Sequence, residues 1–188
     1  MKERLPPLEP HAMTEEQKTA AAALAAGPRG GVRGPFVALL RSPELMSRMQ
    51  KVGEYLRYQS ALEPRLAEFA MLIVARHWTQ QFEWAVHHPL ALDAGIARAA
   101  LDALAEGRRP RPLREDEEAM FDFCDELLRT HGASDATYES ALRLLGERGL
   151  IDLMGLLGYF TSVSMVLNVA HAPAPAGAAV RALQAFPL

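Results

Sequence analysis

The stretch EFAMLIVARHWTQQFEWAVHH, from Glu68 to His88, combines a core-like composition with an unusual amount of ionisable chemistry. It contains two glutamates, three histidines and one arginine among residues that otherwise favour burial. Its first half has apolar residues at helical spacing, which predicts an amphipathic helix that begins at Pro64. Charged groups are costly to bury unless they are paired or used. The stretch is therefore where we expect the functional site.

The whole chain has the composition of one soluble globular domain. It has 188 residues, of which 49% are hydrophobic and 23% charged. The formal net charge of −3 gives no basic field for nucleic acid, so we expect no nucleic-acid partner. The single cysteine, Cys124, excludes an intrachain disulfide, a Cys-x-x-Cys redox pair and a multi-cysteine zinc site. This cysteine usage fits a reducing environment, and we expect a cytoplasmic protein.

Two segments resemble targeting or membrane signals but are better interpreted as ordinary helices. The alanine-rich residues 20–27 follow TEEQK (Thr14–Lys18), where Thr14 and Gln17 have the spacing of a helix capping box. The uncharged segment Leu153–Leu167 has only 15 residues, which is too short to span a bilayer and suits a buried core helix. We therefore expect no membrane association.

Helical signals extend along most of the chain, and no segment of useful length alternates with period two. The sequence predicts an all-α fold of about seven helices, arranged as helical hairpins without a sheet. The expected helices are Glu15–Ala26, Ser42–Tyr58, one from Pro64, Glu83–Ala94, Ala97–Glu106, Glu115–Thr130, Asp135–Arg148 and Leu150–Ala170. We divide the chain into an N-terminal arm, helix and loop (1–41), a helical domain (42–172) and a C-terminal tail (173–188).

Glu83 and His87 are the first candidate catalytic pair. They are four residues apart, which on a helix places them one turn apart and about 40° apart around the axis. A carboxylate in apolar surroundings that contacts an imidazole forms a pair able to exchange a proton near neutral pH. The same spacing also occurs in surface contacts without function, worth about 0.2–0.5 kcal/mol. His88, further round the helix and before Pro89, is expected to be exposed or capping.

Glu68 can join this pair only if the chain folds back between the two halves of the stretch. In one unbroken helix, Glu68 and Glu83 would be roughly 22 Å apart along the axis. The sequence therefore predicts a sharp break at Trp78-Thr79-Gln80, with Thr79 as the expected cap of the next helix. With that break, Glu68, Glu83 and His87 become one candidate catalytic group.

The run PRLAEFAMLIVARHWTQQFEWAVHHPLALDAG resembles the carboxymuconolactone decarboxylase family, within the wider alkylhydroperoxidase D-like superfamily. The likeness rests on Glu68 in an apolar helix, on Ala75-Arg76, and on Phe82-Glu83-Trp84 followed by His87. In the peroxidase branch of the superfamily a Cys-x-x-Cys pair would fall on Gln80 and Glu83. Both thiols are absent here, so a cysteine-based peroxidase is disfavoured.

The resemblance implies a cofactor-free acid–base enzyme that decarboxylates or isomerises a small lactone or carbonyl acid. In this hypothesis His87 exchanges the proton, Glu83 sets its charge and orientation, and Glu68 is a second acid or base. Arg76 is the expected carboxylate anchor, and Trp84 is expected to contact the substrate. Neither a cofactor nor a metal ion is expected, and the superfamily implies a homo-oligomer.

Two alternatives stay open at this point. One is a superfamily redox protein, and the other is a non-catalytic oligomer or ligand-binding protein in which the three groups make only structural contacts. The loop GPRGGVRGP (Gly27–Pro35) also carries Arg29 and Arg33, whose guanidinium groups suit an anionic ligand. This loop belongs to an N-terminal extension of roughly 40 residues that the smallest family members lack.

Overall fold

The computed structural model describes residues 2–177 and 180–184, which form eight α-helices, one short 3₁₀-helix and no strand. The all-α prediction is therefore confirmed. The helices are α1 (Glu15–Ala26), α2 (Pro35–Leu39), α3 (Pro43–Tyr58), α4 (Pro64–His77), α5 (Gln81–Asp93), α6 (Arg98–Ala105), α7 (Glu115–Thr130) and α8 (Asp135–Ala170). The 3₁₀-helix covers Pro10–Ala12.

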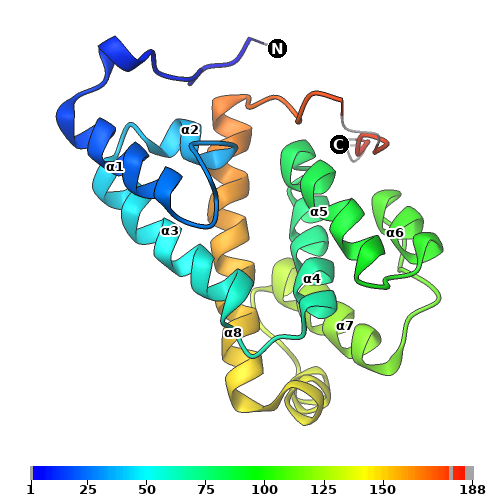
Figure 1. The fold of residues 1–188 in the computed structure, drawn as a ribbon. Coiled ribbons are helices and arrows are strands. Elements are labelled where there is room, and N and C mark those ends of the chain that lie inside the picture. Colours follow the sequence, from blue (N-terminus) through cyan, green and yellow to red (C-terminus); the bar gives the residue numbers. More distant parts are fainter. Residues whose placement is uncertain (1, 178–179, 185–188) are drawn as a thin grey trace.

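The long helix α8 organises the molecule. It packs against α4 and α7 on one side and against α2 and α3 on the other, while α1 covers α3 (Figure 1). Helices α4 and α5 form an antiparallel hairpin beside it, and α7 packs against both α4 and α8. Helix α6 lies on the side of the hairpin away from α8 (Figure 1). The fold thus has two groups of helices joined by one shared helix.

Helix α8 is long and apolar enough to cross a membrane by length and composition, with a mean hydropathy of 1.7 in its most apolar window. However, 56% of that window is buried inside the protein. Leu153, Leu156 and Leu167 are almost fully buried in the main hydrophobic core. The expectation of a buried core helix over Leu153–Leu167 agrees with this packing.

Two differences from the predicted helices have local physical reasons. The two predicted helices Asp135–Arg148 and Leu150–Ala170 are both present within α8, but the kink that separates them falls at Gly146, whose φ of 67° leaves the helical region, rather than at Gly149. The short helix α2 was not expected. It begins at Pro35, which fixes φ in the helical range, and Gly34 before it has a φ of 55° that glycine tolerates.

The N-terminal segment, residues 1–41 of our division, packs closely on the helical domain over its described part. A second hydrophobic cluster joins Ala20 and Leu24 of α1, Phe36 and Leu39 of α2, and Met46 of α3. At its start, the Arg4 backbone amide donates to the Ala170 carbonyl at 2.8 Å. The segment thus builds one wall of the space between the two helix groups.

The C-terminal tail, residues 173–188, is described except for 178–179 and 185–188. Its residue Leu183 is buried, and both backbone groups of Leu183 bond to the Gln81 side chain, at 2.9 and 2.7 Å. These bonds place this part of the tail against the start of α5.

Candidate active site

A sharp turn between α4 and α5 brings the candidate catalytic residues together. Helix α4 ends at His77 and α5 begins at Gln81, and between them Thr79 has a left-handed φ of 48°. The break near Thr79 is where the sequence predicted it. The cap differs, because Gln80 rather than Thr79 caps α5 by accepting bonds from the Phe82 and Glu83 amides, at 2.5 and 3.1 Å.

This turn is fixed to α8 by a second pair of side-chain bonds. The other end of the Gln80 amide donates to Asn168 Oδ1 at 3.0 Å, and Asn168 Nδ2 donates to the Trp78 carbonyl at 2.9 Å. Gln80 is only 2% exposed, so these bonds lie away from competing water. The turn geometry therefore depends on one residue of α8 that is remote in the sequence.

His87 lies between two carboxylates. Its Nδ1 is 2.6 Å from Glu68 Oε2 on α4, and its Nε2 is 3.2 Å from Glu83 Oε2 one turn earlier on α5. The side chains of His87 and Glu83 are 3% and 6% exposed, and that of Glu68 is 15% exposed. The His87 ring packs nearly perpendicular to the Phe160 ring of α8, with 5.3 Å between ring centroids. The structure thus brings together all three predicted groups.

The pKa of His87 is raised above its ordinary value. Burial by itself would lower the pKa, but the hydrogen bonds to Glu68 and Glu83 and the attraction of both carboxylates outweigh that effect. A neutral imidazole can donate through only one nitrogen, whereas an imidazolium donates through both. The protonated ring can therefore donate a hydrogen bond to each carboxylate. This arrangement favours the imidazolium form of the buried His87.

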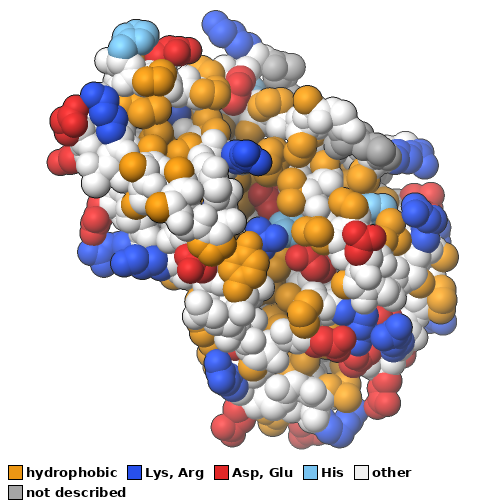
Figure 2. Space-filling model, viewed as in Figure 1, with side chains coloured by type: hydrophobic (Ala, Val, Ile, Leu, Met, Phe, Trp, Pro, Cys, Tyr) orange, Lys and Arg blue, Asp and Glu red, His pale blue; other side chains and the backbone are white. Residues whose placement is uncertain are grey.

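A pocket of about 320 Å³ opens beside this group, between the two helix groups. Glu83 and His87 line it, together with apolar side chains of α5 and α8: Phe82, Val86, Phe160 and Val163. Figure 2 shows the hollow in the middle of the view, with acidic and histidine side chains inside it and basic side chains at its edge. Its volume is at the low end for small-molecule sites, which fits a small ligand.

Glu68 stands behind His87 and does not line the pocket. Its carboxylate is nevertheless the nearer of the two partners of the imidazole. The sequence hypothesis gave the orienting role to Glu83 and made Glu68 a second acid or base. In the structure, Glu83 is the carboxylate that faces the ligand space.

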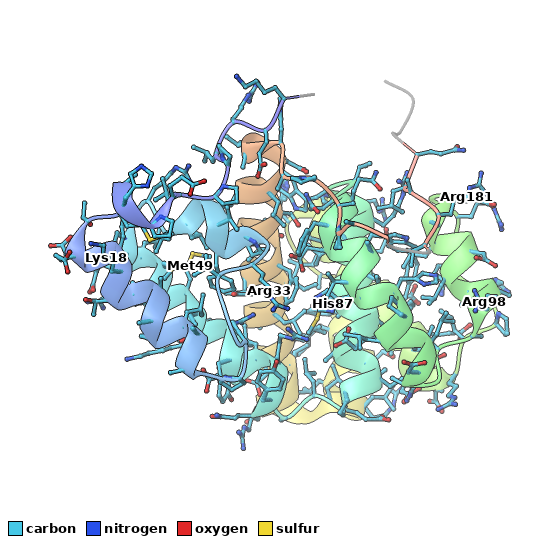
Figure 3. The ribbon with its side chains drawn as sticks, turned by 45° about the horizontal axis from the view of Figure 1, so that its top comes forward. Lys18, Arg33, Met49, His87, Arg98 and Arg181 are labelled. Carbon is cyan, nitrogen blue, oxygen red and sulfur yellow. The ribbon has the colours of Figure 1, made fainter. Side chains whose placement is uncertain are left out.

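The opposite wall of the pocket carries three arginines and a tyrosine. Arg29 and Arg33 come from the loop Gly27–Pro35, Arg57 from α3 and Tyr159 from α8. Figure 3 shows Arg33 on the side of this loop and His87 on the side of α5. Arg29 and Arg33 were candidates for an anionic ligand from the loop composition alone. Sequence reasoning missed Arg57 and Tyr159, because neither lies in a recognisable motif.

The loop is held over the pocket by a close contact with α5. A Cβ atom at Gly34 would lie 2.6 Å from Phe82 Cε1, which is closer than real contacts allow. The left-handed φ of Gly34 adds a second reason for glycine at this position. The contact seats the loop on the same turn of α5 that carries Glu83.

Arg76 and Trp84, the two predicted substrate-binding residues, lie outside this pocket. Arg76 is buried, and its Nη1 donates to the Gln184 carbonyl of the tail at 2.6 Å. Trp84 is 2% exposed and packs against the ring of His88. His88 is itself buried, contrary to the expectation that it is exposed. This side of α5 thus faces the tail and α6 rather than the His87 pocket.

The only cysteine of the sequence lies in surroundings that do not favour a reactive thiolate. Cys124 is fully buried in α7, and its sulfur lies 3.7 Å from that of Met120. Burial raises the pKa of this thiol, and the nearby Asp125 raises it further.

Among the described residues, no group of three or more His, Cys, Asp and Glu side chains has the arrangement of a metal site.

The chain matches no family model and no curated protein by sequence. Its structure is similar to that of a protein of unknown function from Agrobacterium tumefaciens, described as a candidate antioxidant defence protein AhpD. The TM-score is 0.65 at 16% sequence identity, over 73% of this chain and 94% of that one. This likeness concerns the fold. The helices that carry Glu68, Glu83 and His87 therefore share the fold of that protein.

Proposed function

We propose that this protein is a cofactor-free acid–base enzyme that decarboxylates or isomerises a small lactone or carbonyl acid. One observation carries the proposal: a buried imidazole, held between two carboxylates, forms part of the wall of a small pocket. A structural contact alone gives no reason for a pocket to open at that imidazole. The resemblance to carboxymuconolactone decarboxylases supports the same reaction class.

The chemistry needs one proton donor and one electron-accepting carbonyl. In a decarboxylation, the bond to the carboxylate breaks, carbon dioxide leaves, and the electron pair passes into the conjugated carbonyl to give an enolate. His87 then gives its Nε2 proton to the enolate carbon, and water restores that proton in the next cycle. In an isomerisation, the Glu83 carboxylate removes a carbon-bound proton, and His87 returns a proton at the new position.

The three residues have separate roles in this scheme. His87 and Glu83 touch the ligand space, so they are the proposed catalytic residues. Glu68 acts through His87 by holding Nδ1 and by keeping the ring protonated, so it is a positioning residue. Water exclusion is supplied by the loop Gly27–Pro35 and by the apolar side chains of the pocket.

Two observations make the redox alternative weaker. The positions where the superfamily carries its cysteine pair hold Gln80 and Glu83, and Gln80 is committed to capping α5. Cys124 lies in the core of α7 without a second thiol in the chain. Hydroperoxide turnover with a dithiol reductant by the purified protein would reverse this preference.

The test is a screen of lactones and β-keto acids for release of carbon dioxide or for isomerisation, followed by substitution. For a substrate so found, His87→Gln and Glu83→Gln should each lower kcat by about 10²–10⁴-fold. His88→Gln is the matched control, because the neighbouring imidazole packs on Trp84 outside the pocket and should change kcat by less than a few-fold. Full turnover by His87→Gln would contradict the mechanism.

Glu68 needs a different measurement, because a positioning residue is not separated from a structural one by loss of rate alone. In Glu68→Gln the imidazolium loses its nearer charged partner, so the pKa of His87 falls. The alkaline limb of the kcat profile, where His87 loses its proton, should therefore move to lower pH. An unchanged limb would show that Glu68 does not act through His87.

A further inference from the structure

The pocket beside His87 holds a concentration of positive charge that the proposed acid–base chemistry does not use. Arg29, Arg33 and Arg57 all line it, and none of them forms an ion pair with a carboxylate of the described residues. The arginines of another pocket, between α4 and α7, behave differently. There Arg109 pairs with Asp122, and Arg129 pairs with Asp125. In the His87 pocket, by contrast, three arginines lie together without a carboxylate partner among the described residues.

Arg29 is the most constrained of the three. Its Nε and Nη2 atoms are buried, and neither makes a hydrogen bond of good geometry with a described residue. A buried donor without a partner costs about 1–3 kcal/mol. The guanidinium stacks on the Phe36 ring, with 4.6 Å between its Cζ and the ring centroid, so its position is fixed. The Tyr159 hydroxyl is close enough to Arg29 to lower the pKa of the tyrosine, but it does not satisfy Nε or Nη2 with a hydrogen bond of good geometry.

A glycine in α3 makes room for this arrangement. A Cβ atom at Gly53 would lie 2.3 Å from the Tyr159 hydroxyl oxygen and 2.8 Å from Arg29 Nη2. The absence of a side chain at this position therefore allows the arginine and the tyrosine to meet against the backbone of α3. Arg57, one turn further along the same helix, faces the same pocket.

Tyr159 supplies a neutral donor to the cluster. The pKa of its hydroxyl is raised, chiefly by burial, with Arg29 and Arg57 acting against this and Glu83 acting with it. The hydroxyl is therefore protonated at neutral pH and can donate a hydrogen bond. Tyr159 is therefore close enough to Arg29 and Arg57 on one wall, and to Glu83 on the other, for their charges to affect its pKa.

We propose that Arg29, Arg57 and the Tyr159 hydroxyl form the subsite that binds a carboxylate of the substrate, opposite the Glu83–His87 pair. This inference rests on the proposed function and names the substrate class: a small organic acid with an apolar body. Guanidinium forks match the two oxygens of a carboxylate. The body of the acid would lie against the rings of Phe82 and Phe160.

The position of the subsite has a chemical consequence for the reaction. An ion pair stabilises a full carboxylate charge in the ground state, and that charge disperses as carbon dioxide leaves. Holding the departing carboxylate on arginine would therefore raise the barrier. The carboxylate held by Arg29 and Arg57 is accordingly one that remains on the product, and the reacting carbon lies toward His87.

Binding of simple probes to the full chain tests the subsite without a known substrate. Calorimetry should show that phenylacetate binds at least 10-fold more tightly than the uncharged phenylacetamide. Arg29→Gln and Arg57→Gln should each weaken phenylacetate at least 10-fold while leaving phenylacetamide unchanged. Arg98→Gln is the matched control, since Arg98 is exposed on α6, away from His87 (Figure 3), and should leave both affinities unchanged.

The variants also separate this inference from the proposed function. His87→Gln and Glu83→Gln should still bind phenylacetate, because they lie on the opposite wall, even if no turnover is ever found. If Arg29→Gln folds poorly, Arg57→Gln on the partly exposed rim decides the question. The carboxylate subsite would be contradicted if phenylacetate did not bind, or if phenylacetamide bound with the same affinity. It would also be contradicted if Arg57→Gln left the affinity for phenylacetate unchanged, or if inorganic phosphate bound equally tightly.

Discussion

His87 Nδ1 lies 2.6 Å from Glu68 Oε2, although the two residues belong to different helices and are 19 positions apart. This contact joins α4 to α5 at the wall of the pocket. A buried ion pair of this kind has a desolvation cost that its own attraction must offset. The contact therefore makes the stability of the fold depend on the protonation of one histidine.

The raised pKa of His87 predicts a specific dependence of stability on pH. A group whose pKa is higher in the folded state contributes stability that is fully present below its unfolded pKa, about 6.5. The contribution is lost as the pH rises through the folded pKa. Each unit of elevation is worth about 1.4 kcal/mol. The loss of unfolding free energy in His87→Gln should therefore be larger at pH 6 than at pH 9.

Urea denaturation of the wild type and His87→Gln at both pH values measures this difference. His88→Gln is the control, because the pKa of His88 is lowered, chiefly by burial and further by Arg98. The pH dependence of its stability should therefore have the opposite sign. A destabilisation by His87→Gln that is equal at pH 6 and pH 9 would show that the imidazole is not protonated preferentially in the fold.

The turn between α4 and α5 predicts a second effect, on the geometry of the site. Gln80→Ala removes the cap of α5 and leaves the Phe82 and Glu83 amides without their acceptor, which should cost about 1 kcal/mol of unfolding free energy. Asn168→Ala should have a similar cost, because it frees the Trp78 carbonyl and the Gln80 amide. Denaturant unfolding measures both.

A double-mutant cycle shows whether the two residues act as one unit. Since Gln80 and Asn168 bond to each other, the cost of the double variant should be less than the sum of the two single costs. Strict additivity would mean that the bond between α8 and the turn contributes nothing to holding the helices.

The sequence indicated this turn and the groups that it brings together, but only part of the surrounding site. Local signals suffice where a residue fixes its own backbone, as at Pro64 and in the Thr14–Gln17 capping box, and both helices begin as expected. The spacing of Glu83 and His87 is likewise a local property of one helix. The arrangement of Glu68 followed from the fold-back and from the family resemblance.

The rest of the site is built by contacts between remote segments, which leave no local pattern. Arg57 and Tyr159 meet Arg29 only because Gly53 leaves space at a helix crossing. Arg76 and Trp84 belong to the same two helices as Glu68, Glu83 and His87, but the rotation of each helix directs their side chains toward the tail and α6. A motif identifies residue types, whereas the direction that each side chain takes depends on packing.

The buried Cys124 predicts a thiol that does not react in the folded protein. Its pKa is raised by burial, so almost no thiolate is present at neutral pH, and the sulfur is closed off in α7. Ellman's reagent should therefore modify less than a tenth of the thiol in the native state within an hour, and all of it in 6 M guanidinium chloride. Rapid modification of native protein would reopen the redox alternative.

Arg65 is the point where α4 is fastened to α7. Its guanidinium, 5% exposed, bonds to Glu117 and Asp116 at the start of α7, and also to Glu63 at 3.1 Å. The Glu117 side chain is only 3% exposed, so removing the arginine leaves a buried carboxylate without its partner. Arg65→Ala should cost about 3–5 kcal/mol of unfolding free energy.

A surface pair is the appropriate comparison for that variant. Arg129 and Asp125, four residues apart on α7, are 62% and 39% exposed, and Arg129→Ala should cost no more than about 0.5 kcal/mol. Chemical denaturation of both variants gives the contrast directly. A cost of Arg65→Ala close to that of Arg129→Ala would mean that the buried cluster adds nothing beyond an ordinary surface ion pair.

Two glycines on helices provide a last prediction, in which helix propensity and packing oppose each other. Replacing glycine by alanine inside a helix usually stabilises it by about 0.5–1 kcal/mol. At Gly158 on α8 the added Cβ would have no heavy atom of the described residues within 4 Å apart from its own stretch of helix, so Gly158→Ala should follow that rule. At Gly53 the Cβ would meet the Tyr159 hydroxyl and Arg29, so Gly53→Ala should destabilise the protein and displace both groups.

The displacement should also weaken ligand binding. Phenylacetate should bind at least 10-fold more weakly to Gly53→Ala, whereas its affinity for Gly158→Ala should be unchanged. Equal behaviour of the two variants in melting temperature and affinity would show that the close approach at Gly53 shapes neither the fold nor the pocket.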